Sequence, residues 1–179
     1  ISFKKKFKDI NIVDIKYTDL FLSRINNKSI SIDSLSCSIY FENILKKRNK
    51  IVEFIDPIYS LKSIKTELEI KNIIKSHIQD GAALTKFLFW IKKNYNKQII
   101  DEISAQNKLE KFRKMNSKYL FPSFKTIAGS GKNGAIVHYR AKKNNTRTLK
   151  KKEILLCDSG GQYKFGTTDV TRTICFSNQ

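Results

Sequence analysis

Residues 153–173 read EILLCDSGGQYKFGTTDVTRT, and this stretch decides the fold that the sequence predicts. The apolar run 154–157 is typical of a buried strand, and it ends on Asp158. Glycines allow a turn region after it, and residues 167–173 return as a second strand that contains Asp169. Directly opposed Cα atoms of an antiparallel pair lie about 4.5–5.5 Å apart. We therefore expect the carboxylates of Asp158 and Asp169 to face each other across the two strands.

Two carboxylates at that separation repel each other unless a cation lies between them or one of them keeps its proton. The apolar flanks make bare ionisation costly, which favours a cation. Hard oxygen ligands suit Mn²⁺ and related divalent ions. The alternative is a solvated aspartate in a glycine-rich turn together with a threonine-paired aspartate on an exposed strand. The hairpin by itself leaves both interpretations open.

A second segment, residues 129–140, reads GSGKNGAIVHYR and carries His138. The glycine-rich start followed by the apolar residues 135–139 predicts a strand with His138 late in it. On spacing alone, His138 could be a histidine whose hydrogen bonds are satisfied in the core. The glycines do not form a phosphate-binding loop, because Gly-Lys is not followed by Ser or Thr and no strand-to-helix transition is predicted there.

Two helices are predicted before these strands. Thr66 and Glu69 form a capping box, and apolar residues then recur every three or four positions until about Asn94. A second helix is predicted from Asp101, which can cap it, to about Met115. The apolar stripe of the first helix contains Ile70, Ile73, Ile74, Ile78, Leu84, Phe87, Leu88 and Ile91. Short apolar runs at 124–128 and 167–176 predict further strands, so the class is α+β, with helices packed on an antiparallel sheet.

The first 57 residues are organised differently. A short strand at 29–33, a helix at 35–48 and a second strand at 51–55 suit the end of an α/β domain. Such a unit is too short to be stable alone. The chain begins with Ile1 and not with Met, so we expect it to be an internal piece of a longer protein.

Composition argues against two classes of function. The 179 residues carry 35 Lys and Arg against 16 Asp and Glu, a net charge of +19 that would suit nucleic acid. However, 29 of these 35 residues are Lys, and the chain also contains 25 Ile and 14 Asn. A joint excess of Lys, Ile and Asn is typical of A+T-rich codon drift, which places Lys on the surface without a ligand. The basic runs are short and scattered, whereas a nucleic-acid-binding protein usually gathers them on one face. No window approaches the ~18 apolar residues of a membrane span.

The three cysteines, Cys37, Cys157 and Cys175, are widely spaced and form no Cys-x-x-Cys pair. This pattern disfavours a disulfide framework or a thiolate zinc site. Each cysteine is expected to be a small buried hydrophobic residue in a reducing compartment, so the protein is predicted to be cytoplasmic.

The run DSGGQYKFGTTDVTRT, preceded by KNGAIVHYR and SFKTIAGSG, resembles aminopeptidase P. This is the Xaa-Pro aminopeptidase branch of the creatinase and methionine aminopeptidase superfamily, whose catalytic domain has the pita-bread fold. The resemblance is strong over residues 58–179, which would form the first half of that metallopeptidase domain. Residues 1–57 resemble, more loosely, the C-terminal part of the preceding creatinase-like domain.

The resemblance implies a metallopeptidase that releases the N-terminal residue of peptides with proline in second position. Asp158 would bind one of two divalent metal ions and Asp169 would bridge both, with Mn²⁺ favoured over Zn²⁺ or Co²⁺. The metals would lower the pKa of the attacking water and stabilise the developing oxyanion. His138 matches the family's histidine near the substrate carbonyl, which is implicated in binding and proton shuttling. The family also commonly forms homodimers.

The family's remaining metal ligands, one His and two Glu, are expected further downstream than Gln179. We therefore expect the isolated chain to be inactive unless a second polypeptide supplies the missing half. The alternative, from a different class, is a non-catalytic pita-bread module that binds peptides, or a decayed gene remnant. No nucleic-acid or membrane partner is expected.

Other polar side chains near these motifs have simpler explanations. His77 is expected to be a partly buried residue of the long helix and not a metal ligand. Four side chains flank the candidate site residues and could shape a substrate pocket, although sheet packing and surface charge is the favoured interpretation. They are Tyr139, Arg140, Tyr163 and Arg172.

Overall fold

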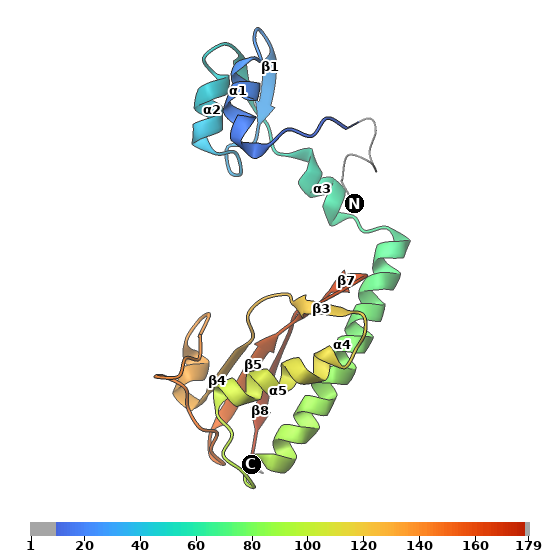
Figure 1. Cartoon of the computed structure of the whole chain (residues 1–179), viewed down its shortest axis with the longest axis vertical. Coiled ribbons are helices and arrows are strands. Elements are labelled where there is room, and N and C mark those ends of the chain that lie inside the picture. Colours follow the sequence, from blue (N-terminus) through green and yellow to red (C-terminus); the bar gives the residue numbers. More distant parts are fainter. Residues whose placement is uncertain (1–9, 178–179) are drawn as a thin grey trace. The chain divides into compact units, whose positions relative to one another are not determined.

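The computed structural model describes residues 10–177. The chain divides into two compact units between Ile64 and Lys65, and each unit is described by itself (Figure 1). We expected the division after residue 57, but helix α3 (Pro57–Ser63) belongs to the first unit. The assignment of the two parts to named domains stays a prediction.

The first unit contains a parallel strand–helix–strand crossover, in the predicted order. β1 (Ser29–Ile32) pairs in parallel with β2 (Lys50–Glu53), and α2 (Ile39–Leu45) connects them. A parallel pair requires such a crossover, because a tight turn can join only antiparallel strands. The short α1 (Thr18–Ser23) packs against α2, and the 3₁₀ turn η2 (Ile15–Tyr17) precedes it.

The helix α2 begins later than residue 35 because a turn precedes it. The Asp33 carboxylate accepts the N–H of Leu35 at 3.0 Å, and the Asp33 carbonyl accepts the N–H of Cys37 at 2.7 Å. Ser38 then caps the helix by accepting the N–H of Tyr40. These local hydrogen bonds occupy the backbone ahead of the helix, as Asp and Ser favour.

The two long helices of the second unit begin where the sequence predicts. For α4 (Glu67–Asn94), the Thr66 hydroxyl accepts the N–H of Glu69 at 3.3 Å, and the Glu69 carboxylate accepts the N–H of Thr66 at 2.7 Å. For α5 (Glu102–Lys114), the carboxylate of Asp101 accepts a backbone N–H three residues later at 2.7 Å. Both arrangements satisfy N–H groups that have no partner inside the first turn.

A three-stranded antiparallel sheet lies against these helices. β5 (Ile154–Ser159) is its central strand, between β4 (Ile127–Ser130) and β8 (Val170–Cys175). The strand predicted at 124–128 thus begins only at Ile127, and the strand predicted from residue 167 begins only at Val170.

A second, smaller sheet interrupts the predicted hairpin. β6 (Gly161–Tyr163) pairs with both β3 (Tyr119–Pro122) and β7 (Gly166–Thr167). The chain therefore leaves β5, forms the short β6–β7 hairpin, and only then returns as β8 beside β5. The predicted turn region between the two strands therefore contains a short hairpin of its own, and the tyrosine of β6 is anchored elsewhere, as described below.

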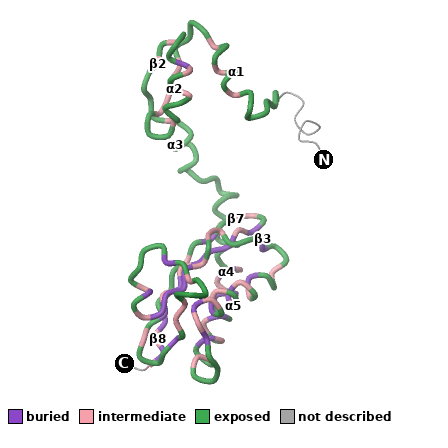
Figure 2. Tube along the Cα trace, turned by 60° about the vertical axis from the view of Figure 1, so that its left-hand side comes forward, coloured by how far each residue is buried: buried purple, intermediate pink, exposed green. Residues whose placement is uncertain are grey.

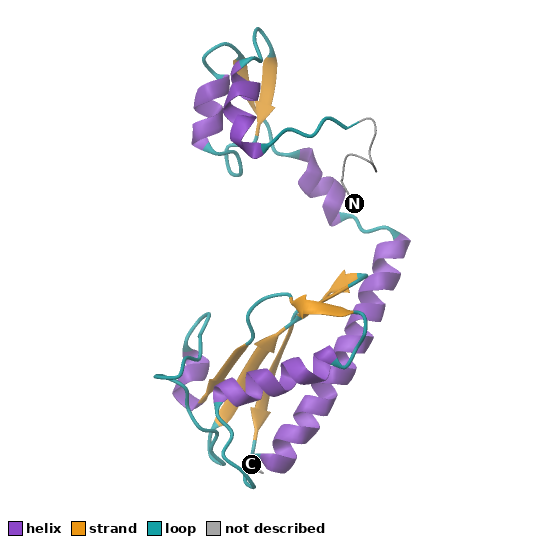
Figure 3. Ribbon diagram, in the orientation of Figure 1, coloured by secondary structure: helices purple, strands orange, loops and turns teal. Residues whose placement is uncertain are grey.

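Helices α4 and α5 cover one face of the β4–β5–β8 sheet (Figures 1 and 3). Figure 2 shows the buried residues gathered where the sheet meets the helices. The core draws on both helices and all three strands, as expected for the predicted α+β class. Its members include Leu84, Phe87, Ile91, Ala105, Leu109, Ala128, Leu155, Cys157 and Ile174.

The apolar stripe of α4 is buried only in its second half. Ile70, Ile74 and Ile78 are exposed, so the recurring apolar residues do not form one continuous core face. The sheet packs against the later turns, whereas the first turns reach the short strand β7. Helical spacing predicts which residues share a face, but it does not predict how far along the helix the partner sheet extends.

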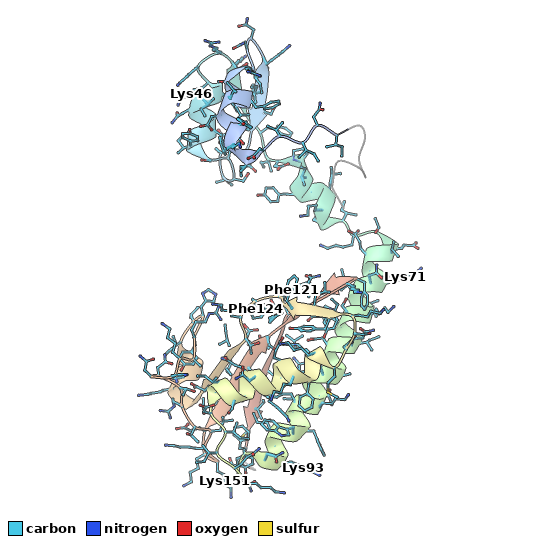
Figure 4. The ribbon with its side chains drawn as sticks, in the orientation of Figure 1. Lys46, Lys71, Lys93, Phe121, Phe124 and Lys151 are labelled. Atoms are coloured by element: carbon cyan, nitrogen blue, oxygen red, sulfur yellow. The ribbon has the colours of Figure 1, made fainter. Side chains whose placement is uncertain are left out.

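The basic side chains labelled on α4 in Figure 4 are far apart, because Lys71 and Lys93 lie at opposite ends of this helix. This distribution agrees with the scattered basic runs of the sequence. Among the described residues, no helix combines the length and the apolar character that crossing a membrane requires.

Candidate metal centre

Strand β5 divides its side chains between the two faces of the sheet. Leu155, Cys157 and Ser159 are buried on the side of the helices, with at most 1% of each exposed. Because side chains alternate along a strand, Leu156 and Asp158 project from the face that α4 and α5 leave uncovered. Asp158 therefore lies half-buried on the open face, near the end of β5.

Asp169 reaches the same open face from the start of β8. Asp158 is paired with Thr171, whose Oγ1 donates to Asp158 Oδ1 at 2.8 Å. Asp169 precedes Thr171 by two residues, so it is the diagonal neighbour of Asp158, with Cα atoms roughly 7–8 Å apart. The expected direct opposition of the two carboxylates is therefore wrong. Asp169 is exposed just outside the ladder.

A close approach of two backbone segments determines where Asp169 lies. Thr168 is buried, donates its N–H to the carbonyl of Gly161 at 2.9 Å, and accepts the N–H of Gly161 on its hydroxyl at 2.9 Å. The carbonyl of Thr168 accepts the hydroxyl of Ser123 at 2.8 Å. A Cβ at Gly160 would lie 1.9 Å from that carbonyl oxygen, so only glycine fits there. These contacts keep Thr168 buried, and Asp169, the next residue, is exposed to solvent.

The aspartate pair fits part of a centre for a hard cation. Two carboxylates on one open face offer oxygen donors of the kind that Mn²⁺ prefers. The bond from Thr171 and the exposure of Asp169 also match the alternative of two solvated side chains. Among residues 10–177, no group of three or more His, Cys, Asp or Glu side chains could hold a metal ion. Within the described residues, the aspartate pair alone therefore does not form a complete metal-binding cluster.

A buried ion pair lies behind Asp158 and ties β5 to both helices. Arg113 of α5 donates from Nε to Asp80 Oδ1 at 2.7 Å and from Nη2 to Asp80 Oδ2 at 3.0 Å, and both side chains are fully buried. Nη2 also donates to Oγ of Ser159, the neighbour of Asp158, at 3.0 Å. Tyr163 of β6 donates to Asp80 Oδ1 at 2.8 Å. One polar network therefore joins α4, α5, β5 and β6.

Burial and Asp80 together set the pKa values in this network. Burial alone would lower the pKa of Arg113, but the hydrogen bonds and charge of Asp80 outweigh it and raise that pKa. Burial, followed by the hydrogen bond to Asp80, raises the pKa of Tyr163. Tyr163 is therefore a neutral donor at neutral pH. Burial likewise raises the pKa of Cys157 to about 11, so this thiol packs as a neutral, apolar group, as predicted, whereas Cys37 and Cys175 are only partly buried, contrary to the expectation for them.

His138 lies in a turn and not in the strand that the sequence predicts. β4 leads into the 3₁₀ turn η3 (Gly131–Ala135), and His138 follows it, exposed, with a φ of 54°. The glycines explain this turn, because Gly131 also has a positive φ. In addition, a Cβ at Gly129 would lie 2.8 Å from the backbone of Asn133. Such a compact turn leaves no extended segment for the predicted strand.

The structure does not join His138 to the aspartate pair. Within residues 10–177, no hydrogen bond or ion pair links its ring to Asp158 or Asp169. The turn η3 nevertheless packs on β4 and β5, so the segment that carries His138 is attached to the same sheet as Asp158.

The side chains of Tyr139, Arg140, Tyr163 and Arg172 make structural contacts within the fold. The hydroxyl groups of Tyr139 and Tyr163 are buried on carboxylates, and the two arginines donate to backbone carbonyls. His77 is exposed and not partly buried as expected, with Nδ1 2.9 Å from the carbonyl oxygen of Ile73.

Sequence reasoning missed the ion pair, although a signal for it was present. Asp80 lies in phase with Leu84 and Phe87 on α4, and Arg113 follows Leu109 by four residues on α5. A charged residue in phase with an apolar stripe faces the core, where it needs a partner of opposite charge. Two such residues of opposite sign on neighbouring helices predict a buried pair.

Comparison with known proteins identifies the family. The pattern of "Metallopeptidase family M24" matches residues 71–179, which is more than half of the chain. The chain therefore belongs to metallopeptidase family M24. It is 46% identical over 140 residues to the Xaa-Pro aminopeptidase ApepP of Drosophila melanogaster, covering 78% of this chain and 23% of that protein.

Two further comparisons agree. A probable Xaa-Pro aminopeptidase P of Paracoccidioides brasiliensis is 42% identical over 130 residues, which cover 72% of this chain and 21% of that protein. The X-prolyl aminopeptidase of Caenorhabditis elegans superposes with a TM-score of 0.86 at 24% identity, over 98% of this chain and 30% of that one, which supports the pita-bread fold. The chain thus spans less than a third of each of these proteins.

The contact at Gly160 leads to a stability prediction. Gly160→Ala should lower the free energy of unfolding by about 1–3 kcal/mol, because its Cβ would displace the carbonyl of Thr168. Gly81→Ala is the matched control: its Cβ would meet nothing within 4 Å, and alanine should stabilise α4 by about 0.5–1 kcal/mol. Urea denaturation measures both variants. Equal stability of Gly160→Ala and the unaltered chain would contradict the described crossing.

Proposed function

We propose that the chain forms the first part of the catalytic domain of an Xaa-Pro aminopeptidase, which releases the N-terminal residue of peptides with proline in second position. The single observation that carries this proposal is the pair of carboxylates, Asp158 and Asp169, on the uncovered face of the β5–β8 pair. Membership of a metallopeptidase family and similarity to Xaa-Pro aminopeptidases support it.

Two divalent metal ions are proposed as cofactors. Asp158 would bind one ion and Asp169 would bridge both, and the oxygen donors favour Mn²⁺, with Zn²⁺ or Co²⁺ as alternatives. When bound, such ions polarise a carbonyl group and lower the pKa of a water. The Caenorhabditis elegans enzyme is described as having a di-nuclear active site, in line with two ions. Thr171 would orient Asp158 through the bond from its hydroxyl.

His138 is proposed to hydrogen-bond the substrate near the carbonyl or the leaving group and to carry a proton there. Its exposure on a turn attached to the sheet of Asp158 supports this role. The peptide is the proposed substrate, and the protein is proposed to be cytoplasmic, as the Caenorhabditis elegans enzyme is described to be.

Further donors must come from outside the described residues, which contain no cluster of three metal-binding side chains. A second polypeptide or a longer form of the chain would supply them, and a homodimer is proposed for the full-length form. The same observation favours a second candidate function, a non-catalytic pita-bread module that binds peptides.

The proposed metal site predicts weak but specific binding of Mn²⁺. With two carboxylate donors, the dissociation constant should be on the order of millimolar, and Asp158→Asn or Asp169→Asn should weaken binding at least about tenfold. Asp14→Asn, which changes an exposed carboxylate of the first unit, is the control and should leave binding unchanged. Calorimetric titration measures all four proteins. Unchanged Mn²⁺ binding by both Asp158→Asn and Asp169→Asn would contradict the assignment.

Turnover separates the two candidate functions. A polypeptide of these 179 residues should release no N-terminal residue from an Xaa-Pro peptide with Mn²⁺ present, because two donors hold the ions too weakly. Adding the complementary second half should restore release from Xaa-Pro but not from Xaa-Ala peptides. Turnover by the 179 residues alone would contradict the expectation of inactivity. Peptide binding without turnover, even after complementation, would favour the non-catalytic module.

A further inference from the structure

The turn that carries His138 is arranged around a buried carboxylate. Glu102 lies in the first turn of α5 and is fully buried. It belongs neither to the aspartate pair nor to the Asp80–Arg113 network. A carboxylate away from water is costly unless hydrogen-bond donors surround it, so its partners indicate what it does.

Four donors from the segment that contains His138 converge on Glu102. Oε1 accepts the backbone N–H of Ser130 at 2.7 Å and Nδ2 of Asn133 at 3.0 Å. Oε2 accepts the hydroxyl of Tyr139 at 2.7 Å and the backbone N–H of Arg147 at 3.0 Å. The amide of Asn133 also lies 3.2 Å from Oε2, so both oxygens of the carboxylate are fully hydrogen-bonded, as an ionised carboxylate requires.

These donors bracket His138 in the sequence. Ser130 and Asn133 precede it, Tyr139 follows it directly, and Arg147 closes the segment. A φ of 54° costs free energy for a residue with a Cβ, and such a conformation persists only where the surroundings impose it. The anchored hydroxyl of Tyr139, one residue on, is such a constraint.

A second set of hydrogen bonds connects only the two ends of the same segment, at Ser130 and Arg147. Arg147 donates from Nη2 to Glu153 at 2.6 Å and from Nε to the carbonyl of Ser130 at 3.1 Å. Both side chains of this ion pair are about a quarter exposed. This ion pair joins the two ends of the segment, whereas Glu102 also contacts Tyr139, the residue next to His138.

We propose that Glu102 is a positioning residue that holds the His138 turn in its observed conformation through Tyr139 and Asn133. The inference rests on the proposed role of His138. Glu102 itself is buried and does not touch a substrate, so it acts only through the turn. Glu102→Gln would replace one acceptor oxygen with an NH₂ group that faces two donors, and so would release half of the contacts.

Tyr139 supplies an independent readout of this network. Burial, followed by the hydrogen bond to Glu102 and the charge of Glu102, raises the pKa of Tyr139 to about 12, against an opposing contribution from Arg147. Without the carboxylate, two of the three raising causes disappear. The pKa of Tyr139 should therefore fall in Glu102→Gln.

The test compares Glu102→Gln with Glu110→Gln by NMR. Glu110 also accepts a tyrosine hydroxyl, that of Tyr119 at 2.7 Å, but lies outside the His138 segment, so it is the matched control. Amide exchange at Ser130 and Arg147 should accelerate about tenfold or more in Glu102→Gln, as loss of bonds to a charged acceptor predicts. Exchange at Leu155 in the core should not change.

The histidine spectrum adds a readout that general destabilisation would not produce. The chain has two histidines, so the ring signal of His138 should shift or broaden in Glu102→Gln while that of His77 stays unchanged. Glu110→Gln should leave both signals in place. Unchanged exchange at Ser130 and Arg147, with an unchanged His138 signal, would overturn the inference.

Two further measurements keep the inference separate from the proposed function. If Glu102→Gln unfolds, Tyr139→Phe removes one donor and should still shift the signal of His138; an unchanged signal would overturn the inference. The Mn²⁺ titration tests the function independently. If the unaltered chain binds Mn²⁺ but the His138 signal is unchanged in Glu102→Gln, only the inference is contradicted. If the His138 signal changes in Glu102→Gln but the unaltered chain binds no Mn²⁺, the inference is supported and the proposed function is contradicted.

Discussion

The ion pair between Asp80 and Arg113 is the contact on which the second unit depends most. Side chains of α4, α5, β5 and β6 meet at this pair. Arg113 also donates to Ser159, which directly follows the candidate metal ligand Asp158. Taking two charges out of water is costly, and the cost is recovered only with good geometry and further hydrogen bonds. Here the fork of the guanidinium matches the carboxylate, and Ser159 and Tyr163 add two neutral partners.

The network also explains how one strand can serve packing and chemistry together. Alternation along β5 sends Ser159 inward to Arg113 and Asp158 outward to the open face, so the position of one constrains the other. Glu102 lies at the other end of α5, where it accepts hydrogen bonds from the segment that contains His138. Both carboxylates are buried supports, whereas Asp158 and Asp169 remain accessible for a ligand.

Local sequence signals predicted a large part of this fold. The capping residues Thr66 and Asp101 mark where α4 and α5 begin, because caps act within one turn. The run ending at Asp158 forms strand β5, as predicted, but only its alternate residues Leu155 and Cys157 are buried, because α4 and α5 cover one face of the sheet. The specificity of the DSGGQYKFGTTDVTRT motif led to the family, which composition alone could not have done.

The remaining features depend on contacts between distant residues, and single-sequence patterns do not contain them. The register that makes Asp169 a diagonal neighbour of Asp158 follows from the approach of Thr168 to Gly160 and Ser123. The segment that carries His138 donates hydrogen bonds to Glu102, which lies 36 residues before His138, and no local sequence pattern predicts this contact. The apolar runs at 124–128, 135–139 and 167–176 are compatible with strands, but hydrogen bonds between distant residues determine which parts of them form strands.

A double-mutant cycle on Asp80 and Arg113 tests the central claim most directly. The free energy of unfolding is measured for Asp80→Ala, Arg113→Ala and the double variant. Each single substitution should cost about 3–5 kcal/mol, because it leaves one buried charge without its partner. The double variant should cost less than the sum of the two by about 2–3 kcal/mol. Additive losses, or single losses below about 1 kcal/mol, would contradict the claim that this pair holds the helices to the strand that carries Asp158.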